Sequence, residues 1–268
     1  MQRYFIQSEQ FRDQTILLDG EEAHHLIRVM RARPGDRIIV SDGDRLEALA
    51  ELTRIDKDAA EARVVEWLAM DREPAVQVTV AQSLPKGDKL ELVIQKGTEL
   101  GACRFIPFIS ERTVVQYDER KEAKRLERWR KIAKEAAEQA HRNRVPQIET
   151  PASWKQLLQM REQFDLALLC YEQVGGSAGF RPLLQKLREE WSQRKGATPE
   201  GAETRDQEPK VLLIIGPEGG FSEREAEQAA QAGIHLVGLG KRILRTETAG
   251  LVGLACIMYE FNEMGGTL

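Results

Sequence analysis

The chain has 268 residues, 41% of them hydrophobic, which suffices for one large domain or two smaller ones. Its formal net charge of -4 excludes a global attraction to polyanions, so any nucleic-acid surface has to be local. No apolar stretch approaches the ~20 residues of a membrane span and the N-terminus lacks the apolar core of a signal peptide, so a cytoplasmic location is expected.

The first quarter of the chain is predicted to form a small β-barrel or sandwich. Short alternating stretches at residues 15–18, 37–41, 48–55 and 60–67 are separated by Asp-Gly, Pro-Gly-Asp and Asp-Gly-Asp turn signals. A helix is predicted over residues 21–30, because Leu26, Val29 and Met30 recur at helical spacing. The pattern changes near Pro74, so the first domain is assigned to residues 1–73.

Strands and helices alternate from residue 74 to residue 268, which indicates an α/β domain with a mainly parallel sheet and flanking helices. Asp88 is expected to cap a helix that runs through Leu100, and a long helix is predicted over residues 119–141. Residues 193–210 have almost nothing to bury and predict a mobile loop. The expected strands are residues 76–80, 104–109, 166–171, 211–215 and 234–237.

Two glycine-rich loops, residues 216–221 and 239–245, follow the last two predicted strands and precede helices. Ser222 and Glu225 form an S-x-x-E capping box at the first of these helices. Because glycine lacks a Cβ, such loops can approach a ligand with their backbone. The spacing matches neither GxGxxG nor a Walker loop, which disfavours a triphosphate site. The alternative is two strand-to-helix connections that bind nothing.

Four sequence runs together carry a family resemblance: Gln95-Lys-Gly-Thr-Glu-Leu-Gly101, Glu138-Gln-x-x-Arg-Asn-Arg-Val-Pro146, Gly216-Pro-Glu-Gly-Gly-Phe-Ser222 and Leu239-Gly-x-Arg-Ile-Leu-Arg-Thr-Glu-Thr-Ala249. In this order and spacing they resemble the RsmE family of 16S ribosomal RNA uridine-N3 methyltransferases, in the SPOUT superfamily. The resemblance spans nearly the whole chain. It implies a PUA-like RNA-binding β-barrel at residues 1–73 and a SPOUT domain with a deep trefoil knot at residues 74–268. It also implies an obligate homodimer that uses S-adenosylmethionine, with 16S ribosomal RNA in the 30S subunit as its substrate and no metal.

If the resemblance holds, the two loops bind S-adenosylmethionine, whose adenine and methionine parts need backbone donors and acceptors in an apolar cleft. The end of a third strand is expected to line the same pocket. Gly250 and Gly253 lie at small-residue spacing on the following helix, which predicts close helix packing at the dimer interface. The predicted cofactor-binding residues are Leu169, Cys170, Tyr171, Ile215, Gly216, Pro217, Glu218, Gly219, Gly220, Leu239, Gly240, Ile243, Leu244, Arg245 and Thr246.

Methylation of uracil N3 requires loss of an imide proton and stabilisation of the resulting anion. Arg245 is the first candidate catalytic residue, because a fixed cation could stabilise the uracil oxygens. The alternative is a structural ion pair between Arg245 and Glu218 or Glu247. Glu218 and Glu247 are also candidate catalytic carboxylates, and together with Glu99 they leave the general base open.

Local basic residues are expected to bind RNA phosphates. Some lie in the first domain, some in loops after strands, and some at the end of the long helix. The predicted RNA-binding residues are Arg3, Arg28, Arg31, Lys86, Arg112, Arg142 and Arg144. Three other functions stay open: a SPOUT-type methyltransferase for another RNA, a non-catalytic RNA-binding protein, and a metabolic α/β enzyme that binds a phosphorylated small molecule.

Overall fold

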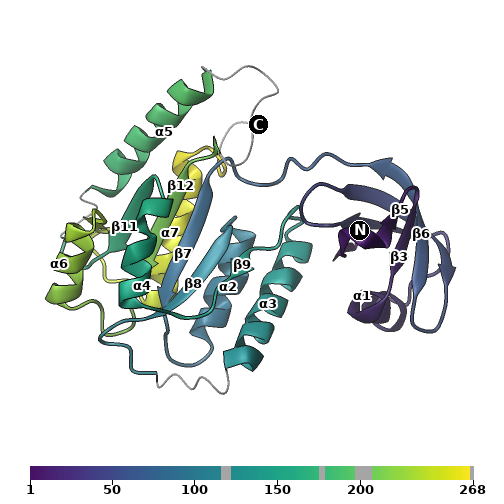
Figure 1. The fold of residues 1–268 in the computed structure, drawn as a ribbon, viewed down its shortest axis with the longest axis horizontal. Helices are drawn as coiled ribbons and strands as arrows, with labels where there is room; N and C mark the ends of the chain where they lie inside the picture. The colour runs from purple at the N-terminus through teal and green to yellow at the C-terminus, as the bar shows by residue number, and fades with distance from the viewer. Residues whose placement is uncertain (116–121, 175–178, 197–206, 266–268) are drawn as a thin grey trace. The chain divides into compact units, whose positions relative to one another are not determined.

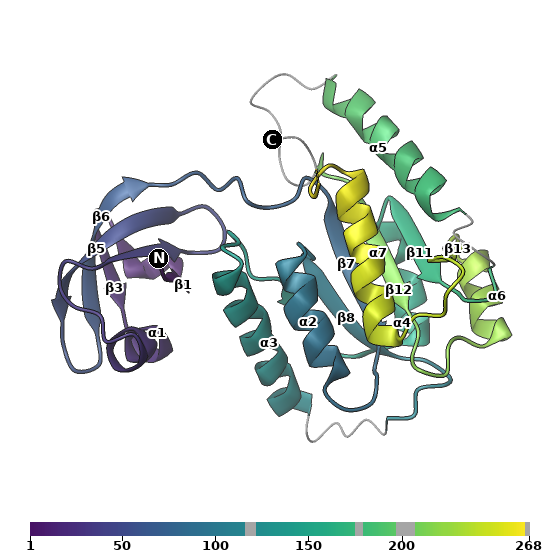
Figure 2. The same ribbon diagram turned by 180° about the vertical axis from the view of Figure 1, so that it is seen from behind.

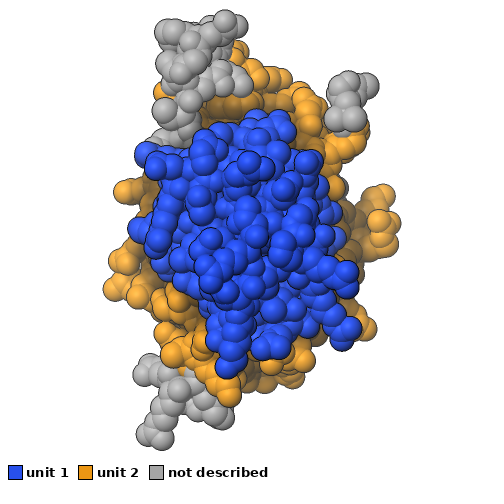
Figure 3. All heavy atoms as spheres, turned by 90° about the vertical axis from the view of Figure 1, so that its right-hand side faces the viewer, with its two compact units in different colours: residues 1–73, 134–145 blue, residues 74–133, 146–268 orange. Residues whose placement is uncertain are grey.

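The computed structural model describes residues 1–115, 122–174, 179–196 and 207–265. The chain divides into two compact units, drawn in Figure 3. Unit 1 comprises residues 1–73 and 134–145, and unit 2 comprises residues 74–133 and 146–268. The predicted boundary left residues 134–145 in the second domain, whereas these residues pack with the first unit. The predicted mobile loop at 193–210 falls largely outside the described residues.

Unit 1 contains a curled six-stranded sheet with the strand order β1-β4-β5-β6-β3-β2. Alternating apolar residues point inward and form its core, which includes Ile16, Leu26 and Val40. The four predicted strands are confirmed. The strands are β1 (Arg3–Phe5), β2 (Phe11–Arg12), β3 (Thr15–Leu18), β4 (Arg37–Ser41), β5 (Glu47–Ile55) and β6 (Ala60–Trp67).

The predicted helix at residues 21–30 is confirmed, but its hydrogen bonding changes along its length. It begins as α1 (Gly20–His24) and continues as a π-helix at His25–Val29. Leu26 lies in the core of unit 1, whereas Val29 and Met30 are exposed, so only part of the apolar pattern faces inward.

A buried polar cluster explains why residues 134–145 belong to unit 1. Arg3 pairs with Glu47, and Nδ2 of Asn143 donates to Glu47 Oε2 at 2.6 Å. Arg142 Nη2 lies 2.5 Å from Glu73 Oε2. Arg3 and Arg142 are only 1% and 4% exposed. This corrects the prediction that they grip RNA phosphates, since both guanidinium groups are enclosed and neutralised by carboxylates.

Unit 2 is built on a parallel sheet with the strand order β10-β8-β7-β12-β11-β13, and β9 also pairs with β8. The predicted parallel sheet is thus confirmed. The strands are β7 (Gln77–Ser83), β8 (Arg104–Ile109), β9 (Gln147–Ile148), β10 (Ala152–Ser153), β11 (Leu166–Cys170), β12 (Lys210–Ile215) and β13 (His235–Val237).

Helices cover both faces of this sheet, with α2 and α7 on one face and α4 and α6 on the other (Figures 1 and 2). The helices of unit 2 are α2 (Lys89–Glu99), α4 (Trp154–Gln159), α5 (Phe180–Gly196), α6 (Glu223–Gln231) and α7 (Thr246–Glu260), and α3 (Glu122–Gln139) has residues in both units. The capping box of Ser222 and Glu225 is confirmed at α6. Asp88 precedes α2 at the N-cap position, but its side chain accepts no capping hydrogen bond, which corrects the role predicted for it.

Two glycines let α7 lie close to the sheet. A Cβ at Gly253 would lie 2.9 Å from a methyl carbon of Leu213 on β12, and one at Gly250 would lie 3.3 Å from Gln82 Oε1 on β7. The close packing predicted for these glycines is present. It is made with the sheet of the same chain, which corrects the prediction that it serves a dimer interface.

The strand order brings two loops to the same edge of the sheet. β12 lies between β7 and β11, whereas β13 pairs with β11 on its other side. The chain then returns to α7, which packs against β12 and β7. Residues 238–245 therefore pass the carboxyl ends of β11 and β12, where residues 216–221 also lie.

Candidate active site

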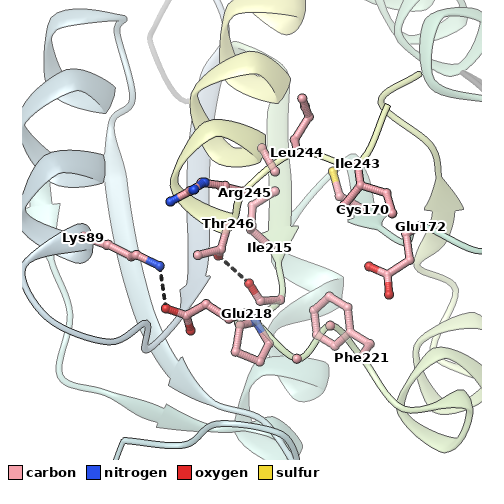
Figure 4. Close-up of a pocket in the computed structure, with 15 residues that line it drawn as sticks. Lys89, Cys170, Glu172, Ile215, Glu218, Phe221, Ile243, Leu244, Arg245 and Thr246 are labelled. Atoms are coloured by element: carbon pink, nitrogen blue, oxygen red, sulfur yellow. Dashed lines mark hydrogen bonds and ion pairs between the residues drawn. The ribbon is translucent and has the colours of Figure 1, made fainter. Parts of the chain in front are cut away.

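A pocket of about 450 Å³ opens at the carboxyl ends of β11 and β12 (Figure 4). Both glycine-rich loops contribute to it, together with the first turns of α2 and α7. Its lining residues are Lys89, Cys170, Glu172, Ile215, Gly216, Pro217, Glu218, Gly219, Gly220, Phe221, Ile243, Leu244, Arg245, Thr246 and Ala249.

The first loop is held down by a buried aromatic anchor. Phe221 is 2% exposed and stacks on Phe108, with ring centroids 6.4 Å apart, while Trp154 lies at 5.6 Å. A Cβ at Gly216 would lie 3.0 Å from the Phe221 ring, so a side chain there would displace the anchor.

Glycine is also required on the pocket side of this loop. Gly220 has φ +65°, in the left-handed region, and its amide donates to Pro217 O at 2.9 Å. A Cβ at Gly219 would lie 3.1 Å from Cβ of Arg112, whose Nη1 donates to Gly219 O at 3.0 Å. At Gly219 and Gly220 the loop therefore presents only backbone atoms to the pocket.

The second loop leaves its backbone unpaired. In the part of the chain that the structure describes, none of the amides of residues 239–244 donates a hydrogen bond. Ile243 and Leu244 of this loop line the pocket, and the Ile243 side chain is 88% exposed. These amides are therefore available to a ligand.

A buried hydrogen-bond chain connects the two loops. Gln82 Nε2 donates to Thr246 Oγ1 at 2.8 Å, and this hydroxyl donates to Gly216 O at 2.6 Å. Because the hydroxyl accepts from one side, its proton is directed to the carbonyl on the other. The start of α7 is thereby fixed to the end of β12.

On the charged side of the pocket, Lys89 lies between two carboxylates. Its Nζ lies 2.7 Å from Glu218 Oε1 and 3.7 Å from Glu247 Oε2. The Lys86 amide also donates to Glu218 Oε1, at 3.1 Å. Partial burial pushes the pKa of Glu218 up, but the hydrogen bonds from Lys89 and the backbone outweigh it, so the pKa lies below its usual value. Glu218 is therefore a stable carboxylate and a weak proton acceptor.

Arg245 lies at the N-cap position of α7 and lines the pocket. Within the described residues its guanidinium makes neither an ion pair nor a hydrogen bond, since Glu218 and Glu247 both face Lys89. The alternative of a structural Arg245 ion pair is therefore not realised. On the opposite side, burial raises the pKa of the Cys170 thiol to about 12, so this residue contributes a neutral surface.

The pocket brings together eleven of the fifteen predicted cofactor-binding residues, namely Cys170, Ile215, Gly216, Pro217, Glu218, Gly219, Gly220, Ile243, Leu244, Arg245 and Thr246. Leu169 and Tyr171 do not line it, because their side chains are buried in the core of unit 2. Leu239 and Gly240 belong to the second loop but also lie outside the lining.

Four lining residues were missed by sequence reasoning: Lys89, Glu172, Phe221 and Ala249. Lys89 follows the predicted cap of α2, yet its pocket partner Glu218 is 129 residues away in the sequence. Glu172 lies just beyond the third predicted strand, so strand-end position was the available signal for it.

The remaining predicted RNA-binding residues differ in their exposure and in whether their side chains already have a partner. Arg28, Arg31 and Lys86 are exposed. Arg112 is exposed, but its guanidinium bonds to the first glycine loop. Arg144 is half-buried and lies 3.4 Å from Asp44 Oδ1.

Two further properties concern the described residues. No group of three or more His, Cys, Asp or Glu side chains among them is arranged to hold a metal ion. Of the helices in the described ranges, none has the length and apolar character needed to cross a bilayer.

Comparisons with known proteins agree with this architecture. Residues 72–258 match the family of RNA methyltransferase domains, and residues 18–65 match the RNA methyltransferase PUA domain. A curated relative from Bacillus subtilis, ribosomal RNA small subunit methyltransferase E, is 43% identical over 99% of both chains.

Solved structures show the same relationship. A ribosomal RNA small subunit methyltransferase E from Neisseria gonorrhoeae, bound to S-adenosylmethionine, is 31% identical, with a TM-score of 0.77 over 97% of both chains. A Legionella pneumophila structure described as containing bound S-adenosylmethionine is 30% identical, with a TM-score of 0.78 over 96% of both chains. With a PUA domain, a parallel-sheet methyltransferase domain and this level of identity, the chain belongs to the ribosomal RNA small subunit methyltransferase E (RsmE) family.

Proposed function

We propose that this chain is an S-adenosylmethionine-dependent methyltransferase that acts on N3 of a specific uridine in 16S ribosomal RNA. The observation that carries the proposal is the pocket formed by two glycine-rich loops at the carboxyl ends of β11 and β12. Family membership supports the reaction class, and the Neisseria gonorrhoeae relative is described as binding S-adenosylmethionine.

The pocket residues fit this cofactor. The unpaired amides of Ile243 and Leu244, which line the pocket, can donate to adenine nitrogens or to the methionine carboxylate. Ile215, Ile243 and Leu244 supply an apolar surface for the adenine ring. When bound, the cofactor supplies an electrophilic methyl group.

We assign Arg245 the role of stabilising negative charge on uracil oxygens. Its guanidinium is exposed at the pocket and has no partner among the described residues, so it is free to meet a substrate anion. Lys89 cannot do the same without releasing Glu218, to which it donates at 2.7 Å.

The two catalytic carboxylates receive different roles in this proposal. Glu218 is occupied by Lys89 and by the Lys86 amide, so we assign it a positioning role. Glu247 Oε2 is buried without a hydrogen-bond partner and faces Lys89 at a longer 3.7 Å, so we favour Glu247 as the proton acceptor.

The oligomeric state, the cellular location and the knot form part of the same proposal. We infer a homodimer, supported by the exposure of Ile243, Tyr259 and Met264 beside and along α7. We infer a cytoplasmic enzyme that acts on the assembled 30S subunit. The knot that the resemblance implies is supported by the return of the chain from β13 to α7 past two strand ends.

The test is incubation of the protein with labelled S-adenosylmethionine and 30S subunits from cells that lack the activity, followed by nucleoside mass analysis. We expect label in one N3-methyluridine per 16S molecule. Label on a ribose or on another base, or no label in the 30S subunits, would overturn the assignment. Sedimentation equilibrium tests the dimer in the same preparation.

A further inference from the structure

The pocket contains a carboxylate to which the proposed function assigns no role. Glu172 lines the pocket just beyond β11 and is exposed. Within the described residues its carboxylate makes neither an ion pair nor a hydrogen bond, whereas Glu218 and Glu247 both face Lys89. Figure 4 shows Glu172 across the pocket from Lys89, with its carboxylate directed into the space between them. This carboxylate is therefore open to a ligand in the pocket.

The first glycine loop leaves room for this carboxylate. A Cβ at Gly220 would lie 2.8 Å from Glu172 Oε1 and 3.1 Å from Oε2. Any larger residue at position 220 would therefore displace the carboxylate, in addition to straining the backbone at φ +65°. Both oxygens of Glu172 thus lie close to the backbone of the loop, at the wall of the pocket.

The two sides of the pocket differ in their chemistry, and this difference orients the cofactor. Arg245 and Glu247, to which the proposed function assigns the methyl transfer, lie on the same side as Lys89. The methyl group has to be presented there. On the opposite side, the neutral thiol of Cys170 lies near Glu172. The nucleoside part of the cofactor therefore extends toward Cys170 and Glu172.

We propose that Glu172 recognises the ribose of S-adenosylmethionine by accepting hydrogen bonds from its 2′- and 3′-hydroxyl groups. The diol offers two donors side by side, and the carboxylate offers two acceptor oxygens. An acidic side chain binds the ribose of NAD in a similar manner in Rossmann folds. The ammonium group of the methionine part is the competing donor, and a ligand that lacks it separates the two contacts. This inference rests on the proposed function, which supplies the ligand.

Calorimetry with S-adenosylhomocysteine and its 2′,3′-dideoxy analogue measures the contact directly. The wild type should bind S-adenosylhomocysteine about 10- to 100-fold more tightly than the dideoxy analogue, because hydrogen bonds to a charged acceptor are lost. Glu172→Ala should bind S-adenosylhomocysteine more weakly by the same factor. Its affinity for the dideoxy analogue should stay within about threefold of the wild type, which also shows that the variant is folded.

The ligand 5′-methylthioadenosine keeps the ribose but lacks the ammonium and carboxylate groups. Glu172→Ala should weaken the binding of this ligand about 10- to 100-fold as well. Glu223→Ala is the matched control, since Glu223 is exposed at the start of α6, next to the same loop, and does not line the pocket. This variant should bind all three ligands as the wild type does.

The inference is overturned if Glu172→Ala keeps the wild-type preference for S-adenosylhomocysteine over its dideoxy analogue. It is also overturned if the variant binds 5′-methylthioadenosine like the wild type, which would assign Glu172 to the ammonium group. Failure of the proposed function looks different. In that case the wild-type protein itself would bind no S-adenosylhomocysteine or would leave N3 of uridine in the 30S subunits unlabelled, and neither result depends on Glu172.

Discussion

At the scale of single residues, the pocket separates an occupied cation from a free one. Lys89 is engaged by Glu218 and Glu247, whereas Arg245 has no such partner among the described residues. Both side chains carry one positive charge, so the difference lies in their positions: Lys89 Nζ is 2.7 Å from Glu218 Oε1, whereas no described carboxylate lies within ion-pair distance of the Arg245 guanidinium. It makes Arg245 the cation that a substrate anion can recruit.

Arg245→Ala should lower turnover by about 100- to 1,000-fold, the cost of losing one donor to a developing anion. The affinity for S-adenosylmethionine, measured by calorimetry, should stay within about threefold of the wild type. Arg242→Ala, an exposed arginine in the same loop, is the control and should keep full activity. Equal turnover for the wild type and Arg245→Ala would exclude this arginine from the reaction.

Gly219→Val tests the close approach of backbone to ligand. The added side chain should weaken S-adenosylmethionine binding about 10- to 100-fold, as overpacking commonly costs 1–3 kcal/mol. Because the added Cβ also nears Arg112, the double variant Arg112→Gly/Gly219→Val removes that clash. If the double variant recovers wild-type affinity, the loop does not contact the ligand.

At the scale of elements, β7, β12 and α7 meet at Thr246. The two hydrogen bonds of its hydroxyl tie Gln82 on β7 to the Gly216 carbonyl that follows β12. The predicted strands and the Ser222 capping box were readable from local sequence, because periodicity and capping involve residues a few positions apart. The hydrogen-bond chain could not be predicted from the sequence, since Gln82 and Thr246 are separated by 164 positions.

Thr246→Val should lower the free energy of unfolding by about 1–3 kcal/mol, because it leaves a buried carbonyl without its donor. It should also weaken cofactor binding, since the two loops lose their connection. Thr246→Ser keeps the hydroxyl and should restore cofactor affinity. Denaturant titration and calorimetry measure the two effects, and a serine variant as weak in binding as the valine variant would contradict the role of the hydroxyl.

At the scale of the whole molecule, unit 1 carries a half-buried titrating carboxyl group, that of Glu138. Burial, together with the nearby charge of Glu22, raises the pKa of Glu138 from 4.5 to about 7. The Phe5 amide donates to Glu138 Oε1 at 3.3 Å. Because the folded pKa exceeds the unfolded one, the folded state binds this proton more tightly. The stabilisation is complete below pH 4.5 and is lost as pH rises through about 7.

Unit 1 should therefore become less stable between about pH 5 and pH 8, by at most about 3 kcal/mol from this group. Hydrogen exchange of the β5 and β6 amides reports the free energy of opening of this unit. Glu138→Gln keeps an acceptor for the Phe5 amide but cannot ionise, so it should flatten the pH dependence. The same pH dependence in the variant and the wild type would assign the effect to another group.

The sequence by itself determined the strands, the capping box, the two glycine loops and the family. Each depends on residues close together in the chain, or on motifs whose order is enough to recognise. Only the tertiary structure decided which charges are free. From the sequence, Arg3 and Arg142 are predicted to bind RNA, but in the structure they are buried and paired with Glu47 and Glu73. The ion pair of Lys89 with Glu218 is likewise visible only in the structure. Ion pairing depends on distance in space, which the order of residues along the chain does not reveal.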